Sequence, residues 1–477
     1  MTAGRFSPGS RCVGGLGAAA VLALLAGCEV GPDYHRPAVP TPPAFAENGP
    51  WQAAAPKDML PKANWWKIFA DDDLDRLETT ATAANPTVQA ALARVDEARA
   101  VARVSLASLL PSFAVNTVGS RTGYSANREL PPGASQVGYT TNSLDLPLDL
   151  SYQLDVFGQV RRGYEAAQAL AQAQAAAYQT VVLSLQAEVA QDYYTLRAER
   201  SEKQTLDRTV DGRRRELDLV TKRQTAGASD HLDVYRAEVE LGDAQSAALA
   251  VDQRIAELRH ALALLSGAAP ENFAAPAAPL VGEPPAIPLG LPSDLLERRP
   301  DVAQAERTMA AVNAEVGVAK GAFFPEVGLN AFAGFNSTAF NSLFGRNSKE
   351  WSIAPFVSVP VFQGGRNLAN YERAQAAYTE AAANYRGQVL VAFRDVDDSI
   401  SDLRYLSDQA AVLGASVTAS HHAEDLSLLR YKQGVADYFE VIDAERTSLD
   451  NEVQFAQIQA QRFVGTIQLV KALGGGW

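Results

Sequence analysis

The sequence predicts a mainly α-helical protein with a small β part, built from two copies of one unit. Three observations predict this fold: a long-range repeat, heptad-spaced apolar residues, and short runs in which apolar and polar residues alternate. The repeat is visible where Gly227–Glu238 (GASDHLDVYRAE) aligns with Gly434–Glu445 (GVADYFEVIDAE), 207 residues later. Self-similarity at a fixed offset dictates architecture, so each half should fold as the same series of helices and strands.

The first residues are typical of an exported lipoprotein. Two arginines precede an apolar run, Val13–Ala26, which has the length of a signal-peptide core and is too short to cross a bilayer as a helix. The run ends in Leu-Ala-Gly-Cys, which resembles the bacterial lipobox and implies cleavage before Cys28 and acylation of that cysteine. We therefore expect a signal peptide at 1–27 and lipidation at Cys28. Glu29, in place of an aspartate, favours an outer-membrane destination. The alternative is a buried apolar helix with an incidental thiol.

Composition excludes several kinds of function. The chain has 2 cysteines, and the other one, Cys12, lies in the predicted signal peptide. The mature chain then has no thiol for a disulfide, a metal cluster or a nucleophile. The net charge of −13 argues against nucleic-acid binding, which depends on neutralising phosphates with Lys and Arg. An acidic chain instead suits a surface or lumen that passes cations.

Proline content marks the boundaries between the predicted segments. The segment 28–63 has many prolines and few periodic apolar residues, so we expect an extended, lipid-anchored tether. A first repeat follows at 64–267 and a second at 299–473, and a short tail ends the chain at 474–477. Between the repeats, the connector 268–298 contains seven prolines from Ala268 to Pro292, which exclude a helix there.

Each half is expected to contain a short opening helix, two strands, a long helix and a returning helix. In the first half the helices are predicted at Asn85–Leu110, Ala166–Thr225 and Asp230–Leu265. The two shorter helices placed end to end would match the long one, which predicts helical hairpins of roughly 90 Å with even ends. Apolar residues at heptad spacing indicate coiled-coil packing of the long helices. The first series is Val182, Val189, Leu196, Val210 and Leu217, interrupted by Lys203; the positions 207 residues later are Val389, Val396, Leu403, Val417 and Glu424, with Ala410 opposite the lysine.

Alternating residues predict one strand pair in each half. Leucines or tyrosine occupy every second position from Leu144 to Leu154, and Trp351, Ile353, Val357 and Val359 follow the same pattern. One apolar and one polar face suit a strand between lipid and water, and a half-buried soluble sheet equally well. Four strands are too few for a membrane barrel, so strands in lipid would require several chains to share one barrel. Prolines 147, 355 and 360 are expected at strand ends or bends.

Several stretches resemble the outer-membrane efflux proteins of the TolC type, in the lipoprotein branch that serves resistance–nodulation–division pumps. They are Asn64–Leu77 (NWWKIFADDDLDRL), Ser151–Arg162 (SYQLDVFGQVRR), Leu291–Asn330, Pro360–Arg366 (PVFQGGR) and Tyr438–Leu473. The resemblance implies a homotrimer whose chains each give four strands to a 12-stranded outer-membrane β-barrel, with the helices forming a periplasmic tube. It implies docking to a periplasmic adaptor and an inner-membrane transporter, and an outer-membrane lipid environment. It implies no cofactor.

The resemblance also locates a periplasmic gate at the turns between the long and returning helices. The family's constriction carboxylates fall on Glu440 and Asp443, an acidic partner from the first half falls on Asp233, and a tyrosine of the closed state falls on Tyr431. The family's locking arginine falls on Ala436, so any lock here must use other residues.

Helix capping is the alternative interpretation of these acids. Asp230 with Asp233, and Asp437 with Glu440, have the spacing of capping boxes. Capping is favoured for Asp230 and Asp437, both interpretations stay open for Glu440, and gating is favoured for Asp443.

Other functional classes find little support in the sequence. A periplasmic adaptor lipoprotein is the main rival, although adaptors have one hairpin between β domains. A lipid-tethered hydrolase would need a catalytic motif. The sequence contains no recognisable Ser/His/Asp order, Walker loop or dinucleotide fingerprint. Adjacent His421 and His422 point to different sides of a helix, so no metal site is expected. The predicted function is a passive exit duct for drugs or other small molecules, not an enzyme.

Overall fold

The computed structural model describes residues 29–38, 40–41, 62–127, 137–276, 278–287 and 298–475. The predicted signal peptide and the predicted lipidation site Cys28 lie outside the described residues. The chain divides into two compact units. Unit 1 comprises Met1–Pro37, Asp96–Ala173 and Glu306–Asn384, and unit 2 comprises Ala38–Val95, Gln174–Ala305 and Tyr385–Trp477. Both halves of the sequence therefore contribute to both units.

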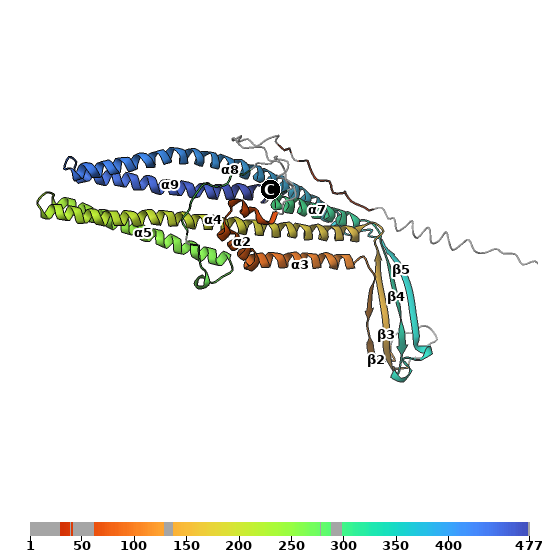
Figure 1. The fold of residues 1–477 in the computed structure, drawn as a ribbon. Helices are drawn as coiled ribbons and strands as arrows, with labels where there is room; N and C mark the ends of the chain where they lie inside the picture. Colours follow the sequence, from red (N-terminus) through yellow and green to blue (C-terminus); the bar gives the residue numbers. More distant parts are fainter. Residues whose placement is uncertain are drawn as a thin grey trace, which may run out of the picture. The chain divides into compact units, whose positions relative to one another are not determined.

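The helices confirm the internal repeat, because three pairs have equal lengths. The pairs are α3 (Pro86–Ala107) and α7 (Pro300–Gly321) with 22 residues, α4 (Gln159–Thr225) and α8 (Arg366–Lys432) with 67, and α5 (His231–Leu265) and α9 (Tyr438–Ala472) with 35. In unit 2, α4 and α5 form one antiparallel hairpin and α8 and α9 form the other (Figure 1). The described chain also has η1 (Lys62–Phe69), α2 (Asp72–Ala84), η2 (Pro270–Asn272), η3 (Phe340–Ser342) and η4 (Arg346–Ser348).

Helix α4 begins at Gln159, seven residues before the predicted start at Ala166. The cause is Asp155, whose carboxylate accepts hydrogen bonds from the backbone N–H groups of Val160 (3.0 Å) and Arg161 (2.8 Å). These are donors that a helix start leaves without intrahelical partners. The alanine-rich pattern after Ala166 gave no sign of this earlier start.

Most of the predicted heptad positions are buried in unit 2, and Val182, Leu217 and Val417 are half-buried. Val189, Leu196 and Val396 are fully buried. Lys203, the interruption of the first series, is accommodated by an ion pair, with its amine 2.6 Å from the Asp207 carboxylate one turn along. Among the described residues, no helix combines the length and the apolar character that crossing a bilayer requires.

The short helices meet end to end at two equivalent joints in unit 2. At the start of α3, Asn85 donates from Nδ2 to the carbonyl of Leu265 at the end of α5 (2.9 Å). In the second half Arg299 donates from Nη1 to the carbonyl of Ala472 at the end of α9 (3.2 Å), and α7 begins at Pro300. The predicted end-to-end placement of the two shorter helices is confirmed at these joints. The bond across the joint is made by the side-chain amide of Asn85 in the first half and by the guanidinium of Arg299 in the second.

The two hairpin turns have the same backbone conformation. Gly227 and Gly434 adopt φ values of +73° and +75°, which only glycine adopts without strain. The residue after each glycine donates its N–H to the carbonyl five residues back, as in a Schellman motif. These bonds are Ala228 to Arg223 (2.8 Å) and Val435 to Arg430 (3.1 Å).

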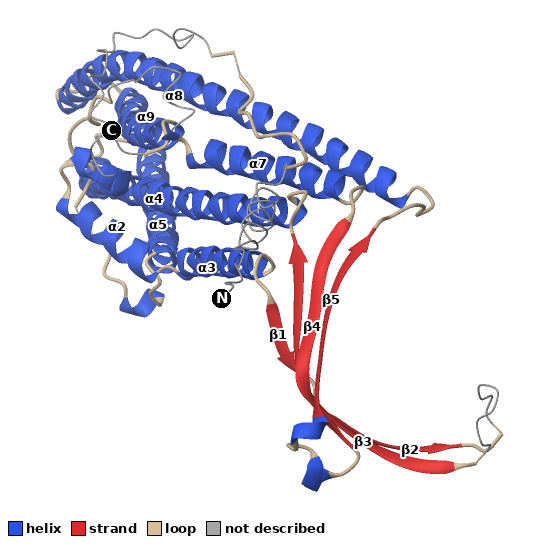
Figure 2. Cartoon of the chain, turned by 90° about the vertical axis from the view of Figure 1, so that its right-hand side faces the viewer, coloured by secondary structure: helices blue, strands red, loops and turns tan. Residues whose placement is uncertain are grey.

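Unit 1 contains one antiparallel sheet (Figure 2). Its strands are β1 (Ser112–Val115), β2 (Val118–Tyr124), β3 (Tyr139–Leu154), β4 (Glu326–Ser337) and β5 (Lys349–Ser358). β1 and β2 pair with successive parts of β3 in one register, so they act as a single interrupted strand. The order is β1/β2, β3, β4, β5, which gives the four predicted strands with β1/β2 and β5 at the edges.

The interruption between β1 and β2 lies opposite Pro147 in β3. The register places Asn116 across from Pro147 on that side and Gly334 of β4 on the other. Proline has no N–H to donate to a ladder, and a Cβ at Gly334 would lie only 2.3 Å from the carbonyl oxygen of Leu146. Pro147 thus lies inside a strand that bends along its length (Figure 2), and Pro355 lies inside the edge strand β5.

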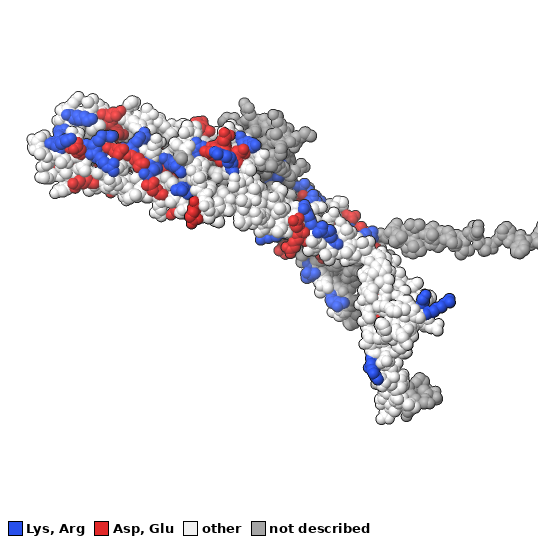
Figure 3. Space-filling model, turned by 60° about the horizontal axis from the view of Figure 1, so that its bottom comes forward, with Lys and Arg blue, Asp and Glu red and all other residues white. Residues whose placement is uncertain are grey.

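One face of the sheet is apolar. Directly paired residues project to the same face, and the register aligns Leu150 with Ala331 and Ile353 across three strands. Both predicted apolar series therefore share a face, and Trp351 and Ile353 on it are 73% and 65% exposed in the single chain. The visible surface of the sheet is nearly free of charged side chains, whereas charges of both signs crowd the helices of unit 2 (Figure 3).

Residues 29–37, here called the N-terminal arm, pack onto unit 1. Val30 donates its N–H to the carbonyl of Phe157 in the turn between β3 and α4 (3.1 Å). Arg162, 4% exposed, holds the arm through the carboxylates of Glu29 (3.2 Å) and Asp33 (2.7 Å). This part of the predicted tether is extended but bound to the folded chain.

Candidate functional site

The two hairpins share an apolar core beside their turns, here called the tip cluster. Every long helix of unit 2 contributes to it, so the turns are held by packing as well as by their own backbone bonds. Its buried residues are Val220 of α4, Ala237 of α5, Tyr431 of α8, and Tyr438, Val441 and Ile442 of α9.

Tyr431 lies in the tip cluster and is 4% exposed. The guanidinium of Arg223, from the other hairpin, stacks on the Tyr431 ring at 4.4 Å and donates from Nη1 to the Tyr431 carbonyl (3.0 Å). Burial raises the pKa of the Tyr431 hydroxyl, so this residue stays neutral at ordinary pH. The contact between Arg223 and Tyr431 therefore links the two hairpins by a cation–π interaction and a charge-assisted hydrogen bond.

Glu440, in the first turn of α9, forms an ion pair with Arg430 at the end of α8. The distance between Nε and Oε1 is 2.9 Å, and the two side chains are 48% and 43% exposed. An exposed pair of this kind stabilises only weakly, by about 0–1 kcal/mol. The Glu440 side chain is thus directed across its own hairpin turn, and a small energy holds it there.

The other two acids of the predicted gate lie in different surroundings. Asp443 is exposed one turn further into α9, and within the described chain no ion pair or side-chain hydrogen bond of its carboxylate is found. Asp233, in the first turn of α5, accepts a hydrogen bond from the Ser229 hydroxyl (2.7 Å) and lies 3.5 Å from Arg236. Asp443 is therefore the acid most available to a neighbouring molecule.

The two expected helix caps differ. Asp437 accepts a hydrogen bond from the backbone N–H of Glu440 (3.1 Å), as a cap does. Asp230 occupies the matching position before α5 but its side chain forms no capping bond, so the expectation for Asp230 is wrong. In that turn the second acid of the expected capping box, Asp233, is engaged by the Ser229 hydroxyl instead.

A buried ion cluster farther along the hairpins was not expected from the sequence. Arg213 of α4 is 4% exposed and contacts the carboxylates of Glu445 of α9, Glu216 (3.4 Å) and Glu240 of α5 (3.6 Å). Glu240 also binds Arg446 through Nη2 (2.5 Å) and Nε (3.2 Å). These five residues, here called the Arg213 cluster, cross between the hairpins. The repeat in the sequence does indicate that the two halves differ here: the residues 207 positions after Arg213 and Glu240 are Ser420 and Thr447, which are uncharged.

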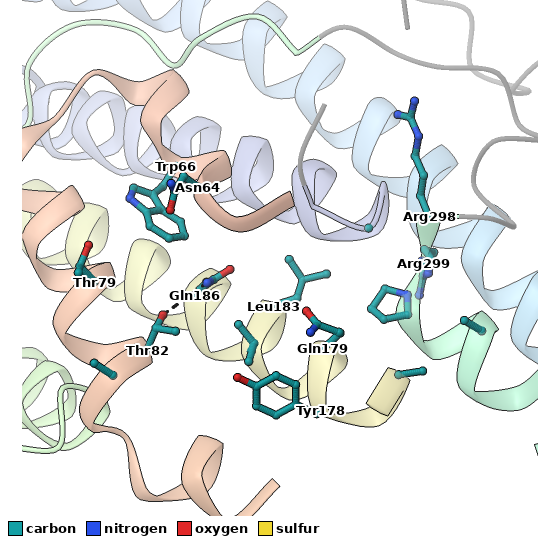
Figure 4. A pocket seen from close by; sticks show the side chains of 16 residues that line it. Asn64, Trp66, Thr79, Thr82, Tyr178, Gln179, Leu183, Gln186, Arg298 and Arg299 are labelled. Atoms are coloured by element: carbon teal, nitrogen blue, oxygen red, sulfur yellow. Dashed lines mark hydrogen bonds between the residues drawn. The ribbon is translucent and has the colours of Figure 1, made fainter. Parts of the chain in front are cut away.

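A cavity of about 700 Å³ lies elsewhere in unit 2 (Figure 4). Gln186 at its wall accepts a hydrogen bond from the Trp65 indole (3.1 Å) and donates to the Thr82 hydroxyl (3.4 Å). The described lining residues include no carboxylate and no histidine, so they provide no general base or metal ligand. Its labelled lining residues are Asn64, Trp66, Thr79, Thr82, Tyr178, Gln179, Leu183, Gln186, Arg298 and Arg299.

Comparison with protein families gives one match, which covers both halves. The model described as outer membrane efflux protein matches residues 78–268 and 291–475. The chain is 32% identical to the outer membrane protein OprJ of Pseudomonas aeruginosa, over 97% of this chain and 96% of that protein. It is also 32% identical to the toluene efflux pump outer membrane protein TtgI of Pseudomonas putida (96% and 97% covered) and 29% identical to the cation efflux system protein CusC of Escherichia coli (96% and 98%).

Solved structures are similar along most of the chain. The outer-membrane channel OprN superposes with a TM-score of 0.87 at 29% identity, over 94% of this chain and 100% of that one. The open state of the Neisseria gonorrhoeae MtrE outer membrane channel gives a TM-score of 0.83 at 29% identity, over 94% and 98%.

Proposed function

Since the chain belongs to the outer membrane efflux protein family, we propose that it is the outer-membrane exit duct of a tripartite efflux pump. The observation that carries the proposal is the match to outer-membrane channels over both halves, so that the hairpins and the sheet are both included. The duct itself is passive, and its cargo is a drug or another small molecule. No enzymatic step and no cofactor form part of the proposal.

The working form is proposed to be a homotrimer. The sheet of one chain exposes an apolar face and has unpaired edges at β1/β2 and β5. Open strand edges in lipid are costly, because no water is present to satisfy backbone N–H and C=O groups. Three chains of four strands each would close a 12-stranded barrel, and the apolar face would meet the lipid.

The proposed partners are a periplasmic adaptor and an inner-membrane transporter of the resistance–nodulation–division class. The energy of transport is spent at the inner membrane, so the duct needs only to open and close. Two of the relatives are named for toluene efflux and for cation efflux, and this chain takes its substrate class from the transporter it serves.

A lipid anchor at Cys28 is proposed as a second attachment to the outer membrane. The arm supports this, because Glu29, the residue after Cys28, is bound to Arg162 and lies against Gly158 in the turn where β3 ends and α4 begins. Mass spectrometry of the mature protein should find acyl chains on an N-terminal Cys28, and Cys28→Ala should remove them. An unmodified or longer N-terminus would contradict the anchor.

The gate is proposed at the hairpin turns, with Glu440, Asp443, Asp233 and Tyr431 as its residues. Three chains that bring Glu440 and Asp443 to one axis would place six carboxylates around a narrow opening. Such a ring attracts cations and repels anions. The exposed Asp443 and the weakly held Glu440 support this, because both side chains are available to a neighbouring chain.

The test is single-channel conductance of the purified protein in planar bilayers. The wild type should conduct weakly, and Glu440→Ala/Asp443→Ala should raise the conductance and lower the cation preference measured in a salt gradient. Asp450→Ala is the matched control, because Asp450 is an exposed acid on the same helix outside the proposed gate.

Two results would contradict the proposal in different ways. A complete lack of conductance in the wild type and in the double variant would contradict the proposal that the protein is a duct. The wild type could instead conduct without preferring cations or anions, and the double variant could behave in the same way. That result would support the duct but show that these carboxylates do not form its gate.

A further inference from the structure

Both cations of the described strands lie on the apolar face of the sheet. Paired residues project to the same face, and successive residues of a strand alternate between faces. Lys349 of β5 pairs with Phe335 of β4, which pairs with Leu146 of β3, a member of the apolar series. Arg121 of β2 pairs with Asn142, four positions before Leu146 in β3, and so projects to the same face.

The acids of the same strands lie on the other face. In the described sheet they are Asp145, Asp149, Glu326 and Glu350. Glu350 shares its row with Pro147, and Asp145 and Asp149 occupy the same alternate positions of β3. Glu326 precedes Val327, whose partner Leu154 belongs to the apolar series. The charges of the strands are therefore sorted by sign, and the apolar face carries the positive ones.

The cations of this part of the chain are not neutralised by the protein. Lys349 and Arg121 are exposed, as is Arg346 in the connection between β4 and β5. Within the described chain no ion pair of these three residues is found. A cation on a lipid-facing surface needs an anion or water as its partner, and the sorting of the acids leaves that partner to come from outside the chain.

Aromatic side chains surround Lys349 at the end of the sheet that carries the connection between β4 and β5, here called the distal end (Figure 2). Phe344 of this connection packs edge-on against Phe335, with ring centroids 5.5 Å apart. Trp351, 73% exposed, is the next residue of β5 on the same face. Exposed aromatic rings are typical of the border between the apolar and headgroup regions of a membrane.

The length of β5 also places Lys349 at such a border. Eight residues separate Lys349 from Val357, which is about 27 Å along a strand at about 3.4 Å per residue. A strand inclined by about 40° rises about 21 Å over that length, and the apolar band of a membrane barrel is about 25 Å tall. Lys349 therefore lies near the edge of the band, where lipid headgroups begin, and not at its centre.

Closing the proposed barrel brings the two cations to one seam. Arg121 is in the edge strand β1/β2 and Lys349 is in the opposite edge strand β5. In a ring of identical sheets, β5 of one chain lies beside β1/β2 of the next. Both cations lie toward the distal end of these edges, on the lipid-facing side, so two chains contribute to each positive site.

We propose that Arg121 and Lys349, with Arg346 close by in the sequence, bind the phosphate groups of a lipid in the leaflet that holds the distal end of the sheet. This inference rests on the proposed function, because a second copy of the chain completes the site. Arginine binds phosphate through two parallel N–H groups and lysine as a point charge. The acyl chains of the lipid then lie along the apolar face beside Trp351, and a trimer has three such sites.

The test compares two lipids that differ by one phosphate. Native mass spectrometry of the purified trimer counts bound diphosphoryl lipid A, or monophosphoryl lipid A with the same acyl chains, as the lipid concentration is raised. The wild type should bind up to three diphosphoryl molecules, at least about tenfold more tightly than the monophosphoryl form, because the latter lacks one charge-assisted contact. Arg121→Gln/Lys349→Gln should weaken binding of the diphosphoryl lipid by at least about tenfold.

Arg214→Gln/Lys222→Gln is the matched control. It removes the same two positive charges from exposed positions of α4 in unit 2, where the side chains are 58% and 72% exposed. This variant should bind the lipid as the wild type does. An equal loss in the control would show that general charge attraction, and not a site on the sheet, holds the lipid.

The outcomes separate this inference from the proposed function. If the wild type conducts but binds both lipids equally, or if Arg121→Gln/Lys349→Gln keeps its affinity, the lipid site is wrong and the duct stands. If the wild type does not conduct but the double variant selectively loses the lipid, the site stands and the duct is wrong. Should the double variant fail to form trimers, Lys349→Gln alone decides, since it removes one charge from the exposed end of β5.

Discussion

Replacing Arg299 with methionine should destabilise unit 2 more than any single change at the equivalent joint in the first half. Arg299 is 7% exposed and binds Asp301 through two nitrogens (3.0 and 2.6 Å). It also reaches the Asp395 carboxylate (3.1 Å) and the carbonyl of Ala472. Burial acts to raise the pKa of Asp301, but the hydrogen bonds and charge of Arg299 outweigh it and leave this pKa below its usual range. The pair is therefore fully ionised at neutral pH.

The magnitude follows from what the substitution leaves behind. Removing one partner of a buried ion pair costs about 3–5 kcal/mol, mostly through the charge left unpaired. Asp395 keeps Arg394 as a second partner (2.7 Å), so we expect the lower end, about 3 kcal/mol. Asn85→Ala removes two capping bonds and the bond to Leu265, with an expected cost of about 2 kcal/mol.

Denaturant unfolding followed by tryptophan fluorescence measures both changes, because Trp65 and Trp66 are buried in unit 2. Adding Asp301→Asn and Asp395→Asn to Arg299→Met should recover part of the loss, since no carboxylate then remains unpaired. An Arg299→Met change below about 1 kcal/mol, or an Asn85→Ala change that exceeds it, would refute the view that buried charge pairing dominates this joint.

Three further predictions concern single groups. Burial raises the pKa of Glu78 well above its usual range. The folded chain therefore keeps a proton that the unfolded chain releases, and the free energy of unfolding falls as pH rises above the ordinary pKa of 4.5. Glu78→Gln should flatten this decline. Burial and the charge of Glu188 raise the pKa of Asp192 to about 6. At pH 7 the folded chain therefore holds an unfavourable carboxylate, and Asp192→Asn should increase the free energy of unfolding by about 1 kcal/mol, a value reduced for partial solvation. Below pH 4 the carboxyl is protonated in the wild type, so the substitution should have no effect. Gly334→Val should prevent insertion into the outer membrane, because the Cβ of the new side chain would collide with the carbonyl of Leu146. The measurement is loss of the heat-modifiable trimer. Normal assembly of the variant would show that β4 can move away from this carbonyl.

The parts of the fold that depend on local periodicity could be predicted from the sequence. Heptad spacing identified the buried residues Val189 and Val396, and alternation identified the apolar face that contains Leu150 and Ile353. Both patterns come from the geometry of one helix or one strand, so a single segment carries them.

The parts that depend on long-range partners could not be predicted. The early start of α4 results from Asp155, and the missing cap at Asp230 accompanies a bond between Ser229 and Asp233. The burial of Arg213 could not be predicted from its residue type, because an arginine on a long helix is usually solvated. Its difference from Ser420 under the repeat was visible in the sequence, but only the structure shows the glutamates that it meets.

The equal lengths of the paired helices have a consequence for how this chain tolerates insertions and deletions. The two halves are offset by 214 residues at α3 and α7 but by 207 at α4 and α8, so the first half has seven more residues between its opening and long helices. One residue added within α4 would rotate everything beyond it by about 100°, taking the heptad series and Arg213 away from their partners. One residue added to a strand-connecting loop disturbs neither. Length changes between related chains should therefore accumulate in those loops, while the helices keep their residue count.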